Sequence, residues 1–510
     1  MKKTLKEYIE LLEQKGLLAE CHISDEIANQ EINYISHNSL DVKEGTLFIC
    51  KGLNFKEQYL NDALEGGAVC YMAERVFDIE PDGGQFIIVN NMRKAMSEVS
   101  AFFFDSVWNH KLNMIGITGT KGKSTTATFV KAIMDNYSKS QGKGEIGFLS
   151  GIYTYDGAKK VKAKKMTTPE TLELHQHLAR CVENDVEYLV METSSQALKY
   201  DRTADLDYKV GGFLNVAEDH ISDREHPDIE DYFASKLKIF SQCETACVNM
   251  EMEDKYLDRV MAEAKSNCSK VITFGCVEGA DYYGYDVEST PSRLSFKVRH
   301  EGGVEDIEVS IGGYYNASNA LAAIAMTRAL GVPFENIKEG LTQVKVAGRK
   351  ELYSMPYKHV DVIVDYAHNK LSYETLFENV KKLYPERKIM LVFGCHGNKA
   401  YNRRKDLGEL ANKYADKIVL TEQDPGTESV EDICNQIKEH IDADKPVTTI
   451  YDRGEAILAA CEMIEDGWVM VIAGNGADGY QKRGLKYVEL PTDGERVQEY
   501  IENEKRNSER

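Results

Sequence analysis

The sequence feature that most constrains the fold is the stretch from Met114 to Val130, which reads Met-Ile-Gly-Ile-Thr-Gly-Thr-Lys-Gly-Lys-Ser-Thr-Thr-Ala-Thr-Phe-Val. A short apolar run stops at glycines and then restarts as an amphipathic helix. The stretch therefore predicts a strand, a phosphate-binding loop and a helix. Gly119 and Gly122 let backbone N–H groups turn inward, and the helix adds the positive end of its dipole.

This loop predicts a nucleotide-binding site. Its expected nucleotide-binding residues are Gly119, Thr120, Lys121, Gly122, Lys123, Ser124 and Thr125. Lys123 can place an ammonium group at the β- and γ-phosphates, and the Ser124 hydroxyl can hold Mg²⁺. The spacing departs from the general G-x4-G-K-S pattern, because Gly116 lies one residue too far back. The alternative is a glycine turn before an ordinary helix, which the order of strand, Gly-Lys-Ser and helix disfavours.

Length and charge bound the remaining possibilities. A chain of 510 residues exceeds what one hydrophobic core usually serves, so two to four domains are expected. The net charge of −21 disfavours nucleic acid or an anionic membrane as the main partner. The scattered cysteines, the absence of an apolar signal core and the absence of a long apolar run predict a cytoplasmic protein with reduced thiols.

The pattern along the chain predicts an α/β protein of three domains. Residues 1–111 combine a helical pattern with short strand-like pieces, which indicates a small α/β domain. Residues 112–346 alternate strands and helices around the phosphate loop, which is typical of a mostly parallel sheet. A second alternating series fills residues 347–510 and predicts a Rossmann-like domain.

Polar residues follow several predicted strands of the central domain. Glu192 comes directly after the apolar run Glu187–Met191, where a carboxylate can help hold Mg²⁺ beside the phosphates. A third strand is predicted at Gly212–Val216, and His220 and Lys236 follow it. A lone His or Lys indicates little. Thr167 and Thr168 begin either a capped helix or a substrate loop, and spacing alone leaves both open.

The C-terminal series has the same arrangement. Its predicted strands are His359–Asp365, Lys388–Gly394, Lys417–Thr421, Pro446–Tyr451 and Trp468–Ala473. Polar clusters follow four of them, at Asp365–His368, His396–Lys399, Gln423–Gly426 and Gly474–Asp478. Ligands bind at the carboxyl ends of strands in such sheets, so a second binding region is expected there.

Together, these motifs resemble the Mur ligase family, and most closely its MurE type. The motifs that carry the resemblance are Gly119–Ser124, Thr167–Glu170, Glu192–Gln196, Asp219-His220, the Lys236 segment, Asn316-x-x-Asn319, Gly348–Glu351, Asp365–His368, Asp452-Arg453 and Tyr480-Gln481. Each motif is weak alone, and their order along nearly the whole chain is specific.

The resemblance implies an N-terminal domain for a uridine nucleotide, a central ATPase domain and a C-terminal domain for the incoming amino acid. It implies an enzyme, an ATP-dependent amide ligase that uses Mg²⁺ and an acyl phosphate. Its substrates would be an amino acid and UDP-N-acetylmuramyl-L-alanyl-D-glutamate, a UDP-muramyl-peptide precursor of peptidoglycan. A monomer is expected.

The resemblance also implies roles for single residues. Lys123, His220 and Lys236 would be catalytic, and Ser124, Glu192, His220 and a carbamoylated Lys236 would hold or orient metal ions. Asn316, Arg349, Asp365 and His368 would contact ATP. The residues that would contact the UDP-muramyl-peptide are Ser39, Thr167, Thr168, Ser194 and Arg202, and those near the amino acid are Asp424, Gly426 and Asp478.

Several positions depart from the family pattern. The family usually has Asn in place of Lys121, His in place of Gln196, Thr-Pro in place of Asn369-Lys370 and Lys in place of Asn475. These departures keep two alternatives open: another ligase of this fold, similar to folylpolyglutamate synthase or a cyanophycin-type enzyme, or a nucleotide-binding scaffold without turnover.

The most informative departure concerns the amino acid. The family's Asp-Asn-Pro-Arg signature is here Gln423-Asp-Pro-Gly426, so the arginine that would grip the distal carboxylate of meso-diaminopimelate is replaced by Gly426. L-Lysine or L-ornithine is therefore favoured, and Gly426→Arg is expected to shift selectivity toward meso-diaminopimelate. A neutral amino acid stays open, as does a contribution from Lys399, Arg403 or Arg404.

Overall fold

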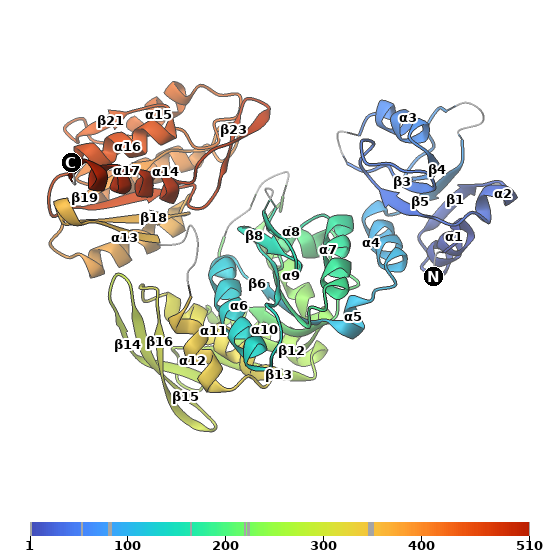
Figure 1. Cartoon of the computed structure of the whole chain (residues 1–510), viewed down its shortest axis with the longest axis horizontal. Helices are drawn as coiled ribbons and strands as arrows, with labels where there is room; N and C mark the ends of the chain where they lie inside the picture. The colour runs from blue at the N-terminus through green and yellow to red at the C-terminus, as the bar shows by residue number, and fades with distance from the viewer. Residues whose placement is uncertain are drawn as a thin grey trace. The chain divides into compact units, whose positions relative to one another are not determined.

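The computed structural model describes residues 3–52, 55–79, 84–163, 166–218, 221, 225–344 and 351–508. The chain divides into two compact units (Figure 1), of which the first is Met1–Tyr283 with Leu321–Gly340 and the second is Gly284–Ala320 with Leu341–Arg510. Three main sheets, whose strands are mostly parallel, carry the fold, which confirms the predicted α/β class.

The N-terminal part of the first unit is a small α/β fold. Its elements are α1 (Leu5–Gln14), β1 (Leu18–His22), α2 (Asp25–Ala28), β2 (Tyr34–Ser36), β3 (Thr46–Ile49), α3 (Glu57–Glu65), β4 (Ala68–Ala73), β5 (Phe86–Val89), α4 (Met92–Phe103) and α5 (Trp108–Lys111). The strand order is β1-β5-β4-β3-β2, and β1 alone pairs antiparallel. Side chains of α1 and α4 pack on one face of the sheet and those of α3 on the other.

The rest of the first unit is built around a larger sheet. Its elements are β6 (Asn113–Thr118), α6 (Lys123–Ser140), β7 (Gly147–Leu149), β8 (Tyr153–Tyr155), β9 (Lys160–Lys162), α7 (Thr171–Glu183), β10 (Tyr188–Glu192), α8 (Ser195–Lys199), β11 (Tyr208–Phe213), α9 (Ile229–Leu237), η1 (Lys238–Gln242), β12 (Cys243–Asn249), α10 (Asp254–Asn267) and β13 (Lys270–Gly275). The strand order in this part of the sheet is β13-β12-β11-β6-β10-β7-β8-β9. The strand β6 thus lies between two parallel neighbours, β10 and β11.

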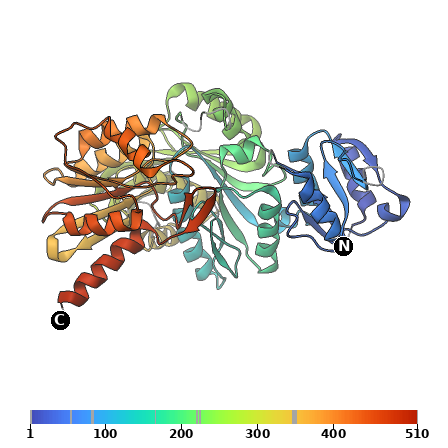
Figure 2. The ribbon, with the colours of Figure 1, turned by 90° about the horizontal axis from the view of Figure 1, so that it is seen from above.

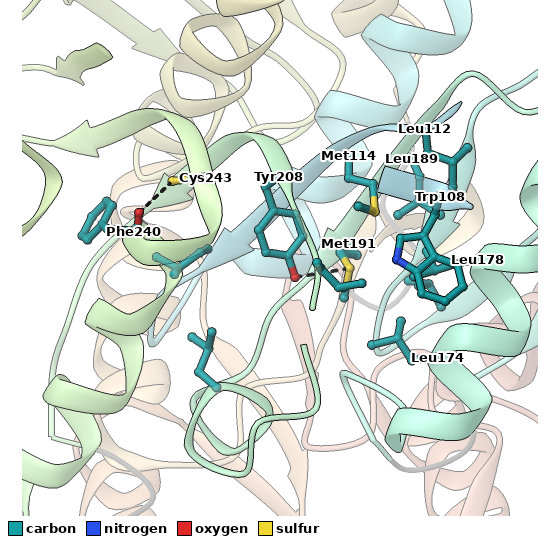
Figure 3. Close-up of a cluster of buried hydrophobic side chains, with 14 of the residues drawn as sticks. Trp108, Leu112, Met114, Leu174, Leu178, Leu189, Met191, Tyr208, Phe240 and Cys243 are labelled. Carbon is teal, nitrogen blue, oxygen red and sulfur yellow. Dashed lines mark hydrogen bonds between the residues drawn. The ribbon is translucent and has the colours of Figure 1, made fainter. Parts of the chain in front are cut away.

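The core beneath β6 leaves no room for a side chain at Gly116. A Cβ atom at Gly116 would lie 2.9 Å from the ring of Tyr208. Figure 3 shows this ring among the buried side chains of the core. The Tyr208 hydroxyl is fully buried, with Thr193 Oγ1 at 3.3 Å and Met191 Sδ at 3.6 Å. Side chains of α7 and α10 join the same apolar cluster. The phosphate loop therefore follows a strand that is packed tightly on this face.

One strand boundary differs from the prediction in a way that affects the site. The apolar run predicts a strand at Gly212–Val216, whereas β11 ends at Phe213. The ladder to β6 stops at the pair Phe213 and Thr118, because β6 itself ends there and turns into the phosphate loop. Asn215 therefore lies in the loop at the carboxyl end of β11 and not within the strand.

The segment after β13 belongs to both units. It comprises β14 (Tyr282–Ser289), β15 (Leu294–His300), β16 (Gly303–Val309), α11 (Asn316–Ala329) and α12 (Phe334–Thr342). β14 begins beside β13 through Tyr282 and Tyr283, and β15 pairs antiparallel with β16. In the first unit, α11 packs against the central sheet, since a Cβ atom at Gly212 would lie 2.5 Å from Met326 Sδ.

The second unit contains a three-layer α/β fold. Its elements are β17 (Glu351–Met355), η2 (Pro356–Lys358), β18 (Val360–Asp365), α13 (Lys370–Leu383), β19 (Ile389–Phe393), α14 (Asn402–Tyr414), β20 (Lys417–Leu420), α15 (Val430–Lys438), β21 (Val447–Thr449), α16 (Arg453–Met463), β22 (Val469–Ala473), β23 (Tyr480–Arg483), β24 (Lys486–Glu489) and α17 (Asp493–Ser508). The strand order is β17-β18-β22-β19-β20-β21. Helices α13, α14 and α15 pack on one face, and α16 and α17 on the other, where Figure 2 shows α17 extending to the C-terminus.

Two further findings bear on the sequence predictions. All 11 cysteines are free thiols. In the part of the chain that the structure describes, no helix is long and apolar enough to cross a bilayer.

The tight packing at Gly116 gives a testable prediction for stability. Gly116→Ala forces a Cβ atom against the buried Tyr208 ring and is expected to lower the free energy of unfolding by about 1–3 kcal/mol. Gly144→Ala is the control, because nothing lies within 4 Å of the Cβ atom it would add. Urea unfolding followed by circular dichroism measures both, and equal stabilities of the two variants would contradict the packing described.

Candidate nucleotide and ligase site

The phosphate loop forms as the sequence predicts. It joins the buried strand β6 to α6, which begins at Lys123. Gly122 precedes the helix with φ +85°, a left-handed conformation that glycine adopts at no steric cost. Lys123 Nζ donates hydrogen bonds to the carbonyl oxygens of Gly119 at 2.8 Å and Thr120 at 3.3 Å. The loop thus combines an open helix N-terminus with an ammonium group, which is an anion-binding arrangement.

Helix α9 delivers a second ammonium group to the same loop. Lys236 is 1% exposed, and its Nζ donates to the Gly119 carbonyl at 2.9 Å. Its Nζ also lies 4.5 Å from the centre of the Tyr232 ring. The Tyr232 hydroxyl donates to Thr120 Oγ1 at 3.1 Å. Lys236, which follows the phosphate loop by more than a hundred residues in the sequence, therefore contacts this loop directly.

Glu192 ends β10 at the same edge of the sheet. It is 2% exposed and stands opposite Ile117 of β6 in the parallel register. Its Oε1 accepts a hydrogen bond from the Gly151 N–H at 3.0 Å. The carboxylate is therefore delivered beside the carboxyl end of β6, as the sequence predicts.

The oxygen atoms that the first unit offers near the phosphate loop fit Mg²⁺. The Ser124 hydroxyl and the Glu192 carboxylate are hard oxygen ligands of the kind that Mg²⁺ uses together with substrate phosphates. Among the described residues, no group of three or more His, Cys, Asp or Glu side chains is placed to hold a metal ion without such phosphates. His220 lies outside the described residues.

A second cluster joins most of the residues predicted to contact the UDP-muramyl-peptide. Thr168 Oγ1 accepts from the Ser194 N–H at 3.0 Å and donates to the Glu192 carbonyl at 2.8 Å. Arg202 donates to the Thr168 carbonyl at 3.4 Å and pairs with Glu170 at 2.6 Å. Thr167 lies next to this cluster, near Gly151. Residues from three separate segments therefore meet beside Glu192.

Glu170 connects this cluster to the N-terminal fold, a contact that the sequence analysis missed. It forms ion pairs with Arg202 and with Lys51, which follows β3. Burial alone would raise the pKa of Glu170, but the charges of Arg202 and Lys51 outweigh it and hold the pKa below its usual value. Ser39 lies in the turn after β2 and makes none of the contacts described for this cluster.

A buried histidine was also missed. His226 is fully buried, with Asp231 Oδ2 2.6 Å from its Nδ1 and Ser195 Oγ 3.0 Å from its Nε2. Lys199 pairs with the same Asp231 carboxylate at 2.6 Å. This network ties α8, which follows the Glu192 loop, to α9, which carries Lys236. No spacing pattern in the sequence indicated it, because His226 lies in an irregular loop.

The remaining predicted ATP contacts lie in the second unit or at its edge. Asn316 is 2% exposed and donates to the Gly312 carbonyl at 2.9 Å, while its Oδ1 accepts from Asn319 at 3.0 Å. Asp365 ends β18 and accepts from the Ala367 N–H at 2.7 Å. His368 Nδ1 lies 2.8 Å from the Tyr366 carbonyl oxygen. Arg349 lies outside the described residues.

The predicted amino-acid residues gather at the carboxyl edge of the second unit's sheet. Asp424 Oδ1 accepts from the Lys482 N–H at 2.8 Å, and its Oδ2 is 3.8 Å from His396 Nε2. Burial lowers the pKa of His396 to about 3, with Lys399 and Arg403 acting in the same direction. His396 is therefore neutral at pH 7. Asp478 is exposed in the turn after β22, where its N–H donates to the Asn475 carbonyl at 2.9 Å.

The backbone conformation at residue 426 favours glycine. Its φ is +59°, its N–H donates to the Lys482 carbonyl at 2.9 Å, and its own carbonyl accepts from Gly484 at 2.6 Å. A Cβ atom would lie 2.3 Å from Asn398 Oδ1. A side chain at this position therefore strains the loop and requires Asn398 to move. The shift in selectivity expected of Gly426→Arg stays a prediction, and it carries this cost in stability.

Arg404 does not replace the missing arginine. It is 3% exposed and donates to Glu428 Oε2 at 2.8 Å and to Gln436 Oε1 at 2.6 Å. The hydrogen bond from Arg404 is the main cause that lowers the pKa of Glu428, so the Glu428 carboxylate is ionised at neutral pH. The guanidinium is thus already engaged with a carboxylate of the protein.

The first unit therefore has the arrangement of a nucleotide-binding domain, with a phosphate loop between a buried strand and a helix. Comparison with known proteins identifies its family. The family profile for the Mur ligase middle domain matches residues 117–327, and the profile for the Mur ligase glutamate ligase domain matches residues 348–476.

Full-length relatives agree with these profiles. The UDP-N-acetylmuramoyl-L-alanyl-D-glutamate--L-lysine ligase of Enterococcus faecalis is 36% identical over 90% of both chains. The UDP-N-acetylmuramyl-tripeptide synthetase of Lactobacillus delbrueckii subsp. bulgaricus is 33% identical over 98% of both chains. The chain belongs to the Mur ligase family, a family of ATP-dependent amide ligases, and these relatives confirm the predicted MurE type.

A solved structure agrees in fold. The structure of a UDP-N-acetylmuramoyl-L-alanyl-D-glutamate--2,6-diaminopimelate ligase matches with a TM-score of 0.66 over 99% of both chains, at 21% sequence identity. At that identity the match supports the fold alone, and it leaves the choice of amino acid to the residues of the site.

The strain at Gly426 is testable. Gly426→Ala combines an unfavourable φ with a contact that displaces Asn398 Oδ1 from Thr427, whose N–H it accepts at 2.9 Å. Gly467→Ala is the control, since Gly467 has φ +77° but open space around it. We expect Gly426→Ala to lower the free energy of unfolding by about 1–2 kcal/mol more than the control, measured by chemical denaturation. Equal losses in the two variants would show that Asn398 does not restrict this position.

Proposed function

We propose that this protein ligates an amino acid to UDP-N-acetylmuramyl-L-alanyl-D-glutamate, with hydrolysis of ATP to ADP and phosphate. The observation that carries the proposal is the 36% identity to the Enterococcus faecalis L-lysine ligase over 90% of both chains. The convergence of Lys123, Lys236 and Glu192 around the phosphate loop supports the ATP-dependent step. Peptidoglycan precursor synthesis in the cytoplasm is the process that this reaction would serve.

The chemistry has two steps. A carboxylate oxygen of the muramyl dipeptide attacks the γ-phosphorus, so an O–P bond forms and the bond to the bridging oxygen of ADP breaks. The amine of the amino acid then attacks the acyl carbon, a C–N bond forms, and phosphate leaves with the former carboxylate oxygen while the amine loses a proton. The acyl phosphate is needed because an oxide is a poor leaving group.

The role of the phosphate loop is to hold the negatively charged triphosphate of ATP close to the negatively charged carboxylate of the muramyl dipeptide. Lys123 and the N-terminus of α6 would stabilise the phosphoryl group during transfer. Bound Mg²⁺ would supply Lewis-acid stabilisation of the phosphate oxygens, held by Ser124 and Glu192. Lys236, as a carbamate, would contribute a further oxygen ligand together with His220.

The remaining roles follow the family arrangement. We assign residues 1–111 to the uridine nucleotide through Ser39, residues 112–346 to ATP, and residues 347–510 to the amino acid. Thr167, Thr168, Ser194 and Arg202 would contact the muramyl dipeptide, and Asn316, Arg349, Asp365 and His368 would contact ATP. The protein would act as a monomer. A folylpolyglutamate synthase-like enzyme is disfavoured because the tripeptide synthetase relative spans 98% of the chain, including the N-terminal fold.

L-Lysine is the proposed amino acid. Gly426 offers no cation for a distal carboxylate, and Arg404 is engaged by Glu428. Asp424 and Asp478, at the same edge of the sheet, suit the distal ammonium group of lysine. The name of the Enterococcus faecalis relative agrees with this choice.

Phosphate release tests the reaction. Wild-type protein with ATP, Mg²⁺, the UDP-muramyl-dipeptide and L-lysine is expected to release phosphate only when all components are present. Lys123→Ala removes the ammonium at the γ-phosphate and should reduce turnover at least about a hundredfold, which corresponds to about 2.7 kcal/mol in the barrier. Lys139→Ala, at the distant end of the same helix, is the control. If Lys123→Ala kept more than about a tenth of wild-type turnover, the assignment of the loop would be wrong.

Direct competition tests the amino acid. With L-lysine and meso-diaminopimelate at equal concentration, mass spectrometry of the product should show mainly the lysine adduct, because Gly426 offers no guanidinium to the second carboxylate and that of Arg404 is engaged by Glu428. L-Ornithine in a parallel reaction measures the preference for chain length. A product containing mainly diaminopimelate would overturn the assignment.

A further inference from the structure

The side chain of Asn215 bonds to the backbone of two consecutive residues of the phosphate loop, Thr120 and Lys121. Its Oδ1 accepts hydrogen bonds from the Thr120 N–H at 3.0 Å and the Lys121 N–H at 2.9 Å. Its Nδ2 donates to the Lys121 carbonyl at 3.0 Å. One amide group thus pairs with both the donor and the acceptor of Lys121, so none of the peptide groups that carry these atoms can rotate without losing a hydrogen bond.

The sheet brings Asn215 to this position. β11 runs parallel to β6, and two hydrogen bonds join the segments that follow these strands, beyond the end of their ladder. The Leu214 N–H donates to the Thr118 carbonyl at 3.0 Å, and the Thr120 N–H also donates to the Asn215 carbonyl at 3.1 Å. A Cβ atom at Gly119 would lie 2.9 Å from the Leu214 Cβ and 3.3 Å from the Asn215 nitrogen. The close approach of this segment therefore requires glycine at 119.

The neighbouring contacts leave the first half of the loop little freedom. The Thr120 hydroxyl accepts from the Ala217 N–H at 3.0 Å and from the Tyr232 hydroxyl at 3.1 Å. Thr120 is 6% exposed. Among these contacts, those of Asn215 alone reach Lys121, the position at which the chain departs from the family's usual asparagine.

We propose that Asn215 is a positioning residue for ATP, which fixes the phosphate loop in its binding conformation before the nucleotide arrives. Fixing the backbone of one residue costs about 1–2 kcal/mol, so a loop that is already ordered binds phosphate with less loss of entropy. Asn215 acts through the backbone of Thr120 and Lys121. The proposal rests on the proposed use of ATP by this same site.

The chemistry of the amide distinguishes asparagine from aspartate at this position. An aspartate would still accept from the Thr120 and Lys121 N–H groups. It could not donate to the Lys121 carbonyl, and it would add a negative charge beside the site of the triphosphate. Asn215→Asp should therefore fold well and bind ATP poorly, through both the lost donor and the added charge. Asn215→Ala adds no charge, so its loss of ATP affinity, measured beside its Tm, is the result that separates positioning from structural support.

The test measures ATP affinity and stability in the full-length protein. Isothermal titration with ATP and Mg²⁺ gives Kd for wild type, Asn215→Ala, Asn215→Asp and the control Asn249→Ala, and thermal unfolding gives Tm for each. Asn249 is a matched control because its side chain donates to the Leu214 carbonyl at 2.8 Å, next to Asn215, and to no phosphate-loop atom among its described hydrogen bonds. Steady-state kinetics adds KM for ATP and for the UDP-muramyl-dipeptide.

Both Asn215 variants are expected to raise the Kd for ATP by about tenfold or more, with Asn215→Asp the weaker binder. The KM for the UDP-muramyl-dipeptide should stay at its wild-type value, and Asn249→Ala should lower Tm without an ATP-specific loss. ATP affinity within about twofold of wild type in a folded Asn215 variant would overturn the proposal. If the Asn215 variants bind ATP normally and the wild-type protein turns over its substrates, the positioning role is wrong and the proposed function stands. If the wild-type protein binds no ATP, the positioning role and the proposed function are both wrong.

Discussion

The site depends on the parallel pairing of β6 with β10 on one side and β11 on the other. Parallel neighbours end at the same edge of a sheet, so the loops that follow these three strands meet there. The phosphate loop, the Glu192 carboxylate and the Asn215 amide each follow one of the three strands. Gly116 permits the pairing by leaving room for Tyr208 beneath β6, where Figure 3 shows the ring among the buried side chains.

In the second unit, ion pairs hold the loops that follow the carboxyl ends of the strands. Arg453 and Asp493 are each 3% exposed and form two hydrogen bonds of 2.7 Å. Arg483 of β23 pairs with Glu422 and with Asp452. A buried pair of this kind is costly to break, because the remaining partner keeps an uncompensated charge. The hairpin of β23 and β24 is thereby held against the loop that contains Asp424 and Gly426, and the conformation of that loop disfavours a side chain at Gly426.

Much of the fold could be predicted because buried parallel strands are continuous apolar runs, which the sequence displays directly. The phosphate loop was also predictable, since Gly122 and Lys123 must lie between a strand and a helix for the loop to work. Side-chain contacts between distant segments were not. Asn215 looked like part of a strand, and its role appears only once β11 is seen to end at Phe213.

Thr167–Glu170 shows the same limit. The residues before α7 resemble a helix cap, and Glu170 does occupy the N-cap position, but its side chain caps nothing. It is engaged by Lys51 and Arg202 instead, because two ion pairs in a partly buried site outweigh one local hydrogen bond. Lys51 follows a strand of another sheet, and no spacing within the sequence could predict its contact with Glu170. Local sequence therefore predicts where a turn lies and leaves its partners to the tertiary fold.

The two lysines at the phosphate loop bear on the state of Lys236. Lys123 and Lys236 both donate to the carbonyl of Gly119, so two ammonium groups lie around one oxygen atom in a largely buried place. Like charges at such a separation repel by several kcal/mol at an effective dielectric of about 20. A carbamate on Lys236 would turn this repulsion into attraction, and it would add the hard oxygen atoms that Mg²⁺ prefers. The position of Lys236 beside Lys123 therefore agrees with the carbamate that we propose for catalysis.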